Sequence, residues 1–259
     1  MRNLSNVEKI VVKVGTSTLT YENGRLNFKR IEVLARVLSD LQNAGKSVVL
    51  VSSGAIGVGR QIMGLDHRPS TVQEKQAAAA VGQPQLMEIY DEFFRKYSQK
   101  TAQILLTHMV IDNVQMYKNA VNTLKNLCDY QIIPIVNEND TVVTDEILFG
   151  DNDTLSAHIA QMVQADLLIL LTDIDGLYDA DPSKNSEARL ILKIEKISDE
   201  IKAMAGDSAS NRGTGGMLTK IAAAEIAHKF GTKTIIMNGE SPENIYNILE
   251  GEEIGTYFE

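Results

Sequence analysis

The sequence predicts an α/β protein with a three-layer αβα sandwich and a mostly parallel central sheet. Short, almost wholly apolar runs alternate along the chain with longer stretches whose apolar residues recur at helical spacing. Continuous apolar strands of this kind are buried on both faces, as in parallel sheets covered by helices. Polar and glycine-rich segments follow several of the runs, and such folds bind their ligands beyond the carboxyl ends of the strands.

The short apolar runs are the expected strands. Glu8–Gly15 is stopped by a glycine, and Asp166–Leu171 is the most apolar run of the chain. The full set of expected strands is Glu8–Gly15, Ser47–Ser53, Ala102–Thr107, Ile132–Val136, Asp166–Leu171 and Thr234–Met237. A small-residue turn is expected at Gly54–Gly59. Thr141–Gly150 is expected to form a short antiparallel hairpin over the sheet edge, and Leu190–Ile197 another hairpin arm.

Helices are expected where apolar residues recur three or four positions apart. Phe28–Gly45 carries this period and ends at a glycine. The other expected helices are Gln73–Tyr97, interrupted around Pro84, then Lys118–Tyr130, Asp153–Ala165, Met217–Gly231 and Glu243–Gly251. No linker, low-complexity tract or internal repeat divides the chain. We therefore expect one domain over residues 1–259, with an N-terminal lobe of about 1–165 and a C-terminal lobe of about 166–259.

Composition and charge exclude several classes of function. The chain has 259 residues, 44% of them hydrophobic, and a net charge of -9. Because an acidic surface repels phosphate backbones and anionic lipids, nucleic acids and membranes are poor partners. No apolar run is long enough to span a bilayer, and the first nine residues do not resemble a signal peptide. Cys128 is the only cysteine, so no intrachain disulfide can form, which favours a cytoplasmic protein.

Several common motifs are missing from the sequence. It contains neither the P-loop pattern nor a G-x-G-x-x-G after a strand. The four histidines are scattered without ligand spacing, so a histidine-based metal site is not expected. The aspartate-rich run Thr172–Pro182 is not an EF-hand loop, because its glycine, Gly176, falls at the fourth position counted from Asp173 rather than the sixth.

Three segments have the chemistry of phosphate-binding loops. Lys13 lies near the end of the first strand and is followed by a glycine and two hydroxyl residues, which supply backbone and side-chain donors. Ser52–Ala55 repeats this pattern after the second strand. In Arg212–Lys220 glycines precede a helix, whose N-terminus favours anions, and Lys220 lies about one turn into it. The alternatives are a lysine that snorkels at a strand end and a surface loop with a helix cap.

Two polar clusters accompany these loops. Asn137–Asp140 follows a strand, and Asp151–Asp153 precedes a helix. Carboxylates and amides beside phosphate loops suit the recognition of an ammonium group, magnesium or the orientation of catalytic lysines. Ordinary turn and cap chemistry explains each cluster alone. Their shared position at one sheet edge, beside the three phosphate-binding segments, favours a phosphoryl-transfer site.

At these residues the sequence resembles the amino acid kinase family, and within it the members that act on L-glutamate. The matching stretches run in order along the chain: Val12–Thr20, Ser52–Gly59, Lys75–Gln83, Pro134–Ser156, Leu170–Pro182 and Gly213–Lys220. The resemblance implies the amino acid kinase fold. It also implies transfer of the γ-phosphoryl group of ATP, with Mg²⁺, to the side-chain carboxylate of L-glutamate, the first step of proline biosynthesis. L-proline as feedback inhibitor, a homo-oligomer and a glutamyl phosphate reductase as partner are further implied.

The resemblance also implies residue roles. Lys13 and Lys220 would stabilise the transferring phosphoryl group, and Asp153 would hold them in place. The N-terminal lobe would bind the amino acid through Ser53, Asn137, Asp140, Asp151 and Asn152. The C-terminal lobe would bind ATP, together with the first loop, through Lys13, Gly15, Thr172, Asp173, Thr214, Gly215, Gly216, Met217 and Lys220. No metal ligand is expected from the protein, because Mg²⁺ would be carried by ATP.

Two departures from the family and two alternatives remain. Many relatives carry a C-terminal PUA domain, which we expect to be absent here, and Gln115–Thr123 is less rich in arginine than the pattern associated with this segment. The alternative enzyme is a kinase for another carboxylate, such as acetylglutamate or aspartate. The alternative without activity is a nucleotide or proline sensor, which predicts the loss of Lys13, Lys220 or Asp153. All three are present.

Overall fold

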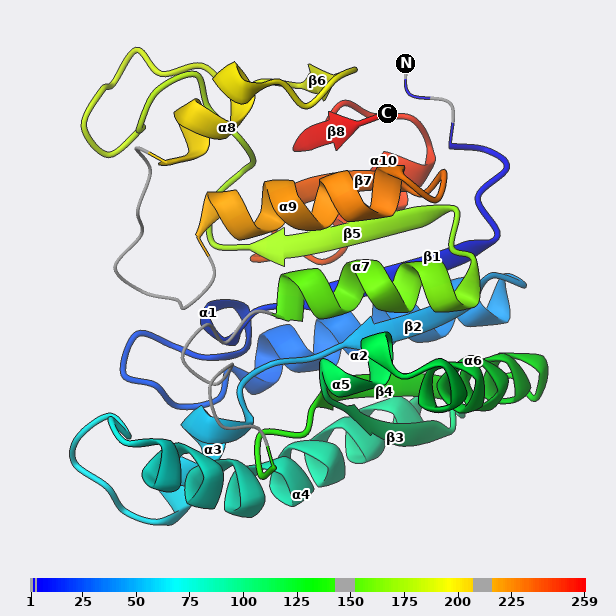
Figure 1. Ribbon diagram of the computed structural model, residues 1–259, viewed down its shortest axis with the longest axis vertical. Helices are drawn as coiled ribbons and strands as arrows, with labels where there is room; N and C mark the ends of the chain where they lie inside the picture. Colours follow the sequence, from blue (N-terminus) through cyan, green and yellow to red (C-terminus); the bar gives the residue numbers. More distant parts are fainter. Residues whose placement is uncertain (1, 3, 143–151, 207–215) are drawn as a thin grey trace.

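A computed structural model describes residues 2, 4–142, 152–206 and 216–259. Its strands form one eight-stranded sheet in the order β3-β4-β2-β1-β5-β7-β8-β6 (Figure 1). The strands are β1 (Lys9–Val14), β2 (Ser47–Val51), β3 (Thr101–Leu106), β4 (Ile133–Glu138), β5 (Leu167–Thr172), β6 (Lys193–Ile194), β7 (Lys233–Asn238) and β8 (Thr256–Phe258). All neighbouring strands are parallel except β7 and β8. The predicted mostly parallel sheet is therefore confirmed.

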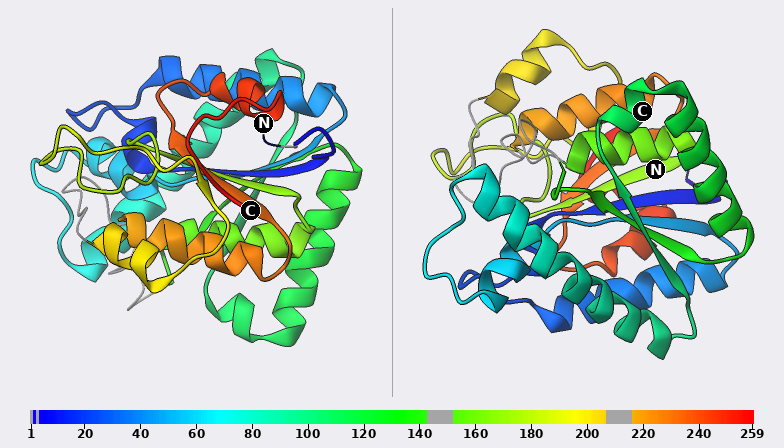
Figure 2. Two further views of the ribbon diagram at one scale, coloured as in Figure 1. Left: turned by 90° about the horizontal axis from the view of Figure 1, so that it is seen from above. Right: turned by 60° about the horizontal axis from the view of Figure 1, so that its bottom comes forward.

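Helices cover both faces of the sheet, which Figure 2 shows edge-on in its left view. The described helices are α1 (Thr16–Leu19), α2 (Phe28–Asn43), α3 (Ala55–Ile62), α4 (Val72–Lys96), α5 (Met109–Asp112), α6 (Val114–Asp129), α7 (Asn152–Val163), α8 (Asp199–Gly206), α9 (Met217–His228) and α10 (Asn244–Leu249). One apolar cluster joins α2, α4 and α10 to the sheet, and a second joins α6, α7 and α9 to the opposite face. The predicted three-layer sandwich is confirmed. None of the helices in these ranges is long and apolar enough to cross a membrane.

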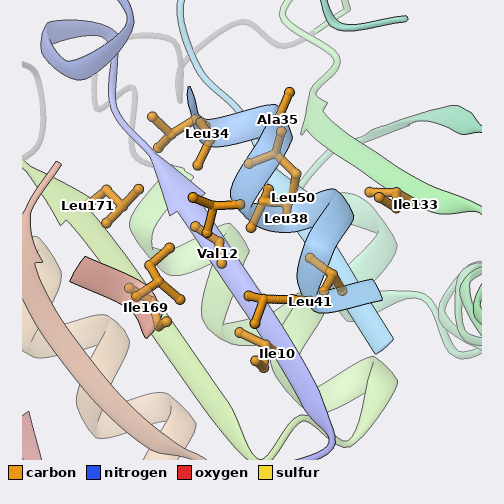
Figure 3. Close-up of a cluster of buried hydrophobic side chains, with 14 of the residues drawn as sticks. Ile10, Val12, Leu34, Ala35, Leu38, Leu41, Leu50, Ile133, Ile169 and Leu171 are labelled. Carbon is orange, nitrogen blue, oxygen red and sulfur yellow. The ribbon is translucent and has the colours of Figure 1, made fainter. Parts of the chain in front are cut away.

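Alternation along β1 decides which way its lysine points. Ile10 and Val12 belong to the apolar cluster under α2, which Figure 3 shows in close-up. Val11 lies in the other cluster, with α7 and α9. Because successive side chains of a strand point to opposite faces, Lys13 lies on the same face as Val11. Near its carboxyl end, β1 thus presents the ammonium group of Lys13 to α7.

Two sequence expectations around α3 and α4 are wrong. The expected turn at Gly54–Gly59 is a helix, α3, with Gly54 as its N-cap in the left-handed region at φ 100°. The expected break at Pro84 does not occur, because α4 continues through it to Lys96. Glycines explain both, since a Cβ on Gly59 would lie 1.7 Å from the Ala78 carbonyl oxygen, and one on Gly82 would lie 1.9 Å from the Ala55 oxygen. The two backbones touch, and this packing outweighs the weak helix propensity of glycine and proline.

The close crossing predicts opposite effects for two glycine substitutions in α3. Gly59→Ala must push α3 away from α4, and we expect it to lower the free energy of unfolding by about 2–3 kcal/mol. Gly57→Ala is the matched control, because its Cβ would meet only the Thr16 methyl group at 3.7 Å. Relief of the glycine entropy should stabilise that variant by about 0.5–1 kcal/mol. Urea unfolding of both variants measures the difference, and equal effects would contradict the crossing.

Other expected elements differ in detail. The segment Leu190–Ile197 is only partly a hairpin arm: Leu190 forms an antiparallel bridge with Tyr178, but β6 pairs parallel to β8. The helix expected from Lys118 begins earlier, at Val114, where Asn113 caps it by accepting from two backbone N–H groups. The short elements α1, α5, α8 and β8 were not expected. Most of the expected hairpin at Thr141–Gly150 lies outside the described residues.

Candidate active site

Two lysines from different elements share one buried carboxylate. The Nζ of Lys13 lies 2.5 Å from Oδ1 of Asp153, and the Nζ of Lys220 lies 3.1 Å from Oδ2 of the same residue. Asp153 is fully buried, and each lysine is only 6% exposed. Burial by itself would raise the pKa of Asp153, but the two ammonium groups outweigh it and hold that pKa well below its usual range. The three groups therefore carry a net charge of +1 at neutral pH.

The elements that carry these side chains meet at one edge of the sheet. In Figure 1 the carboxyl ends of β1 and β5 lie beside the first turns of α7 and α9. Asp153 is in the first turn of α7, where the helix dipole stabilises a carboxylate. Thr219 precedes Lys220 on α9, and its hydroxyl lies 2.9 Å from Oδ2 of Asp153 and 2.7 Å from the Gly216 carbonyl oxygen. The start of α9 is thereby held against the start of α7.

A second polar group, a network of amides, lies at the carboxyl ends of β2 and β4. The Nδ2 of Asn152 lies 2.6 Å from the Ser52 carbonyl oxygen, 3.0 Å from the Ser53 hydroxyl and 2.8 Å from Oδ1 of Asn137. Asn137 in turn donates to Gln83 on α4 at 2.8 Å. Asn152 precedes Asp153, so this network and the lysine pair are joined through one helix start. The structure thus brings together Ser53, Asn137, Asn152 and the charged group, as expected for one site.

Asp140 lies just beyond the end of β4, partly buried. It comes two residues after Glu138, the last residue of β4. Burial raises the pKa of its carboxyl group to about 6. A cation that approaches a partly buried carboxylate stabilises its ionised form, because the positive charge compensates for the lost solvation. The position therefore suits the recognition of an ammonium group.

The remaining expected residues surround the end of β5 and the start of α9. Thr172 is the last residue of β5, and its hydroxyl lies 3.1 Å from a carboxylate oxygen of the exposed Asp173. Gly216 caps α9, and Met217 is buried in its first turn. A Cβ on Gly15 would lie 3.8 Å from the Nζ of Lys13. Asp151, Thr214 and Gly215 lie outside the described residues.

The described part of the site contains two buried ammonium groups, those of Lys13 and Lys220. Within residues 2, 4–142, 152–206 and 216–259, no group of three or more His, Cys, Asp and Glu side chains could hold a metal ion. Two ammonium groups buried at the end of a parallel sheet can instead neutralise an anion that enters there, and they do so strongly because little water competes.

The family model described as "Amino acid kinase family" matches residues 8–238, which include every residue of this site. The chain belongs to the amino acid kinase family. The resemblance of the sequence to this family is thereby confirmed. The fold agrees, since a UMP kinase from Ureaplasma parvum matches with a TM-score of 0.67, 14% identity and coverage of 100% of this chain and 99% of that one.

Curated relatives within the amino acid kinase family are much more similar. A protein of Clostridium perfringens named glutamate 5-kinase is 54% identical over 98% of this chain and 96% of its own length. One of the same name from Thermoanaerobacter sp. is 52% identical over 96% of this chain, but only 67% of the relative is covered. The family thus holds relatives that this chain matches almost end to end and others that are considerably longer.

Sequence reasoning missed three polar side chains of this family's site. Thr219, Gln83 and Tyr90 all contact expected residues, and the Tyr90 hydroxyl lies 2.8 Å from the Ser52 hydroxyl. Gln83 ends a matching stretch, and a buried glutamine on an apolar helix face was the available signal. Tyr90 lies seven residues further along α4, two helical turns, so a helical projection places both on one face.

Proposed function

We propose that this chain catalyses the glutamate 5-kinase reaction, transfer of the γ-phosphoryl group of ATP to the side-chain carboxylate of L-glutamate. The observation that carries the proposal is the pair Lys13 and Lys220 on one buried carboxylate, Asp153. Curated relatives of that name, matched over nearly the whole chain, support the choice of substrate. The products are glutamyl 5-phosphate and ADP.

The reaction needs no general base. An oxygen of the glutamate side-chain carboxylate, already ionised at neutral pH, attacks the γ-phosphorus of ATP, and the bond from that phosphorus to the bridging oxygen breaks. The bonding electrons leave with ADP. Catalysis then reduces to alignment and to neutralising charge on the phosphoryl oxygens. Lys13 and Lys220 supply that neutralisation, and Asp153 holds both ammonium groups in register from its single buried position.

The remaining residues bind the two substrates, the amino acid at one end of the site and ATP at the other. In the N-terminal lobe, about residues 1–165, the amino acid is bound by Ser53, Asn137, Asp140, Asp151 and Asn152. In the C-terminal lobe, about residues 166–259, ATP is bound by Thr172, Asp173, Thr214, Gly215, Gly216, Met217 and Lys220, with Lys13 and Gly15 from the first loop. Asp140 and the amide oxygen of Asn152 receive the α-ammonium group of glutamate.

ATP enters as its magnesium complex. Mg²⁺ bound to the nucleotide would screen the phosphate charges, and Lys13 and Lys220 would add two ammonium groups. The two ammonium groups of Lys13 and Lys220 suit a nucleotide that brings its own metal ion, because they can bind phosphate oxygens beside it.

Partners and location complete the proposal. L-proline acts as feedback inhibitor at or near the glutamate site, and the enzyme works in the cytoplasm as a homo-oligomer. Acyl phosphates hydrolyse readily, so a glutamyl phosphate reductase that takes the product directly is the expected partner.

A trapping assay tests the reaction itself. Purified protein with MgATP, glutamate and hydroxylamine should release ADP and form glutamyl hydroxamate in equal amounts. Aspartate and N-acetylglutamate, at matched concentrations, should give at least about tenfold less, because a site built for an α-ammonium group and a longer side chain rejects both. A stronger signal with either acid would reassign the substrate, and no hydroxamate with any acid would overturn the proposal.

Asp140 gives the site a pH dependence. With its pKa near 6, the carboxylate is ionised at pH 8 and largely protonated at pH 5. We expect KM for glutamate to rise as the pH falls through 6, and KM for ATP to change little. In Asp140→Asn, KM for glutamate should be high at every pH and should lose this dependence. A wild-type KM that stays flat between pH 5 and 8 would contradict the role.

The ionised carboxylate of Asp140 should also lower the free energy of unfolding. Because the folded pKa lies above the unfolded value, the native state binds more protons between about pH 4 and pH 6, and stability falls as the pH rises through that window. At pH 8 the Asp140→Asn variant is therefore expected to have a free energy of unfolding higher than wild type by up to about 2 kcal/mol, after allowing for the partial exposure of the side chain. Urea unfolding measures this difference. The variant should gain nothing at pH 4. Destabilisation at pH 8 would show that Asp140 is already paired.

A further inference from the structure

Gln83 is a buried polar residue on a helix that otherwise packs apolar side chains against the sheet. It is 7% exposed, and α4 contributes Leu86, Tyr90 and Phe94 to the same core. Burying an amide is unfavourable unless it is hydrogen-bonded. Gln83 also precedes a proline in the helix interior, a context that disfavours helical backbone. A buried polar side chain next to a proline inside a helix is locally unfavourable on both counts, and such positions often have a functional role.

The hydrogen bonds of the amide network fix which way each amide points. The Ser52 carbonyl oxygen can only accept, so Asn152 must turn its Nδ2 toward it. The Glu138 backbone N–H can only donate, so Asn137 must present Oδ1, which also accepts from Asn152. Asn137 then has its Nδ2 directed at Gln83, whose Oε1 accepts at 2.8 Å. One consistent set of donors and acceptors runs from α4 to the start of α7.

The set leaves Asn152 in one orientation. Its Nδ2 faces three oxygens, on Ser52, Ser53 and Asn137, so its Oδ1 is turned away from them. An amide oxygen accepts from an ammonium group, and an amide nitrogen repels one. If Asn137 rotated, its amide nitrogen would face the nitrogen of Asn152 and the bond between them would be lost. The orientation of Asn137 therefore matters to the residue beside the charged centre.

We propose that Gln83 is a positioning residue for amino acid binding. It accepts from Nδ2 of Asn137, holds that amide against rotation, and thereby keeps Oδ1 of Asn152 available for the α-ammonium group of the substrate. Gln83 acts through Asn137 and does not touch the reacting atoms. The inference rests on the proposed function, because it assigns the ammonium group of glutamate to Asn152. It predicts an effect on the amino acid alone, since the lysine pair that faces ATP belongs to other elements.

Gln83→Met tests this, because methionine keeps the length and removes the acceptor oxygen. Loss of one buried hydrogen bond is expected to raise KM for glutamate about tenfold. KM for ATP should stay within about twofold of wild type, since both lysines are held by the carboxylate of Asp153 and not by Gln83 or Asn137. Gln83→Glu restores an acceptor oxygen at the same reach and should recover most of the lost affinity for glutamate. A merely structural role would change the unfolding midpoint without this split between the two substrates.

The matched control is Gln85→Met, two residues along the same helix. Gln85 donates to Glu88 at the surface, so its loss should leave both KM values unchanged. Asn137→Ala alone should raise KM for glutamate, and adding Gln83→Met to it should raise KM little further, because Gln83 then has nothing to hold. If Gln83→Met is too unstable to measure, Gln83→Leu, made both alone and with Asn137→Ala, gives the same comparison.

Three results would overturn the inference. They are an unchanged KM for glutamate in Gln83→Met, an equal rise in KM for ATP, and fully additive effects of Gln83→Met and Asn137→Ala. A wild-type protein that forms no glutamyl hydroxamate overturns the proposed function and this inference with it. An active wild type whose Gln83→Met variant binds glutamate normally overturns this inference alone.

Discussion

Replacing Lys220 by alanine is expected to lower kcat by a hundredfold or more while the chain stays folded. The side chain is buried at the start of α9 and reaches the same carboxylate as Lys13. A preorganised cation of this kind stabilises charge that develops in the transition state, and loss of one such group typically costs about 3 kcal/mol. Because the interaction strengthens in the transition state, kcat should fall far more than the affinity for either substrate.

The fold should survive because the carboxylate keeps one partner. In Lys220→Ala the Oδ1 of Asp153 still meets Lys13, and Thr219 still reaches Oδ2. Lys13→Ala should behave in the same way, with Lys220 as the remaining partner. Hydroxamate formation and the circular dichroism spectrum are measured on the same samples. Lys229→Ala is the matched control, since this exposed lysine caps the other end of α9 and should leave turnover unchanged.

Turnover close to wild type in folded Lys220→Ala would remove the basis for phosphoryl transfer at this site. Loss of turnover together with loss of structure would instead assign the residue to stability. A large fall in kcat in Lys220→Ala, with Lys229→Ala normal, separates the two, because both variants remove the same charge from the same helix. Salt dependence gives no substitute for this comparison, since buried charges are screened far less than exposed ones.

The strands and the charged residues of the site could be predicted because each follows from local pattern. The apolar run around Lys13 is interrupted by one cation just before a glycine, which is costly unless an anion faces it. Parallel strands end at one edge of the sheet, so Asn137, near the carboxyl end of β4, was expected at the same edge as Lys13, near the carboxyl end of β1. The pairing of both lysines with Asp153 was implied only by the family resemblance, and the structure supplies its geometry.

What could not be predicted depends on contacts between distant segments. Gly54–Gly59 has the composition of a turn, and it is helical because Gly59 lets its backbone touch that of α4. Pro84 has the local signal of a break, and the close packing of α4 against α3 at Gly59 and Gly82 overrides it. Gln83 lies on the apolar face of α4, but this position alone does not show which group its amide contacts. Its partner lies 54 residues away in the chain.

Replacing Asp153 by asparagine is the second change with a large expected effect, and it should damage both catalysis and stability. The substitution leaves two buried ammonium groups without their shared counter-ion. Removing one partner from a buried ion pair typically costs about 3–5 kcal/mol, because the remaining charge is neither solvated nor paired. Turnover should fall by a hundredfold or more, since the ammonium groups of Lys13 and Lys220 lose the shared carboxylate that fixes their positions relative to each other. Urea unfolding and the hydroxamate assay measure the two losses.

The pH and ligand dependence of Asp153→Asn distinguish a counter-ion from an ordinary buried side chain. In the wild type the pKa of Asp153 is lowered, so its stabilisation is complete above about pH 4 and is lost as the pH falls further. The variant should lack this part of the acid sensitivity. MgATP should stabilise the variant more than the wild type, because the phosphates supply the missing negative charge to Lys13 and Lys220. If Asp153→Asn instead keeps wild-type stability at pH 7 and gains nothing extra from MgATP, the carboxylate is not the group that balances the two lysines.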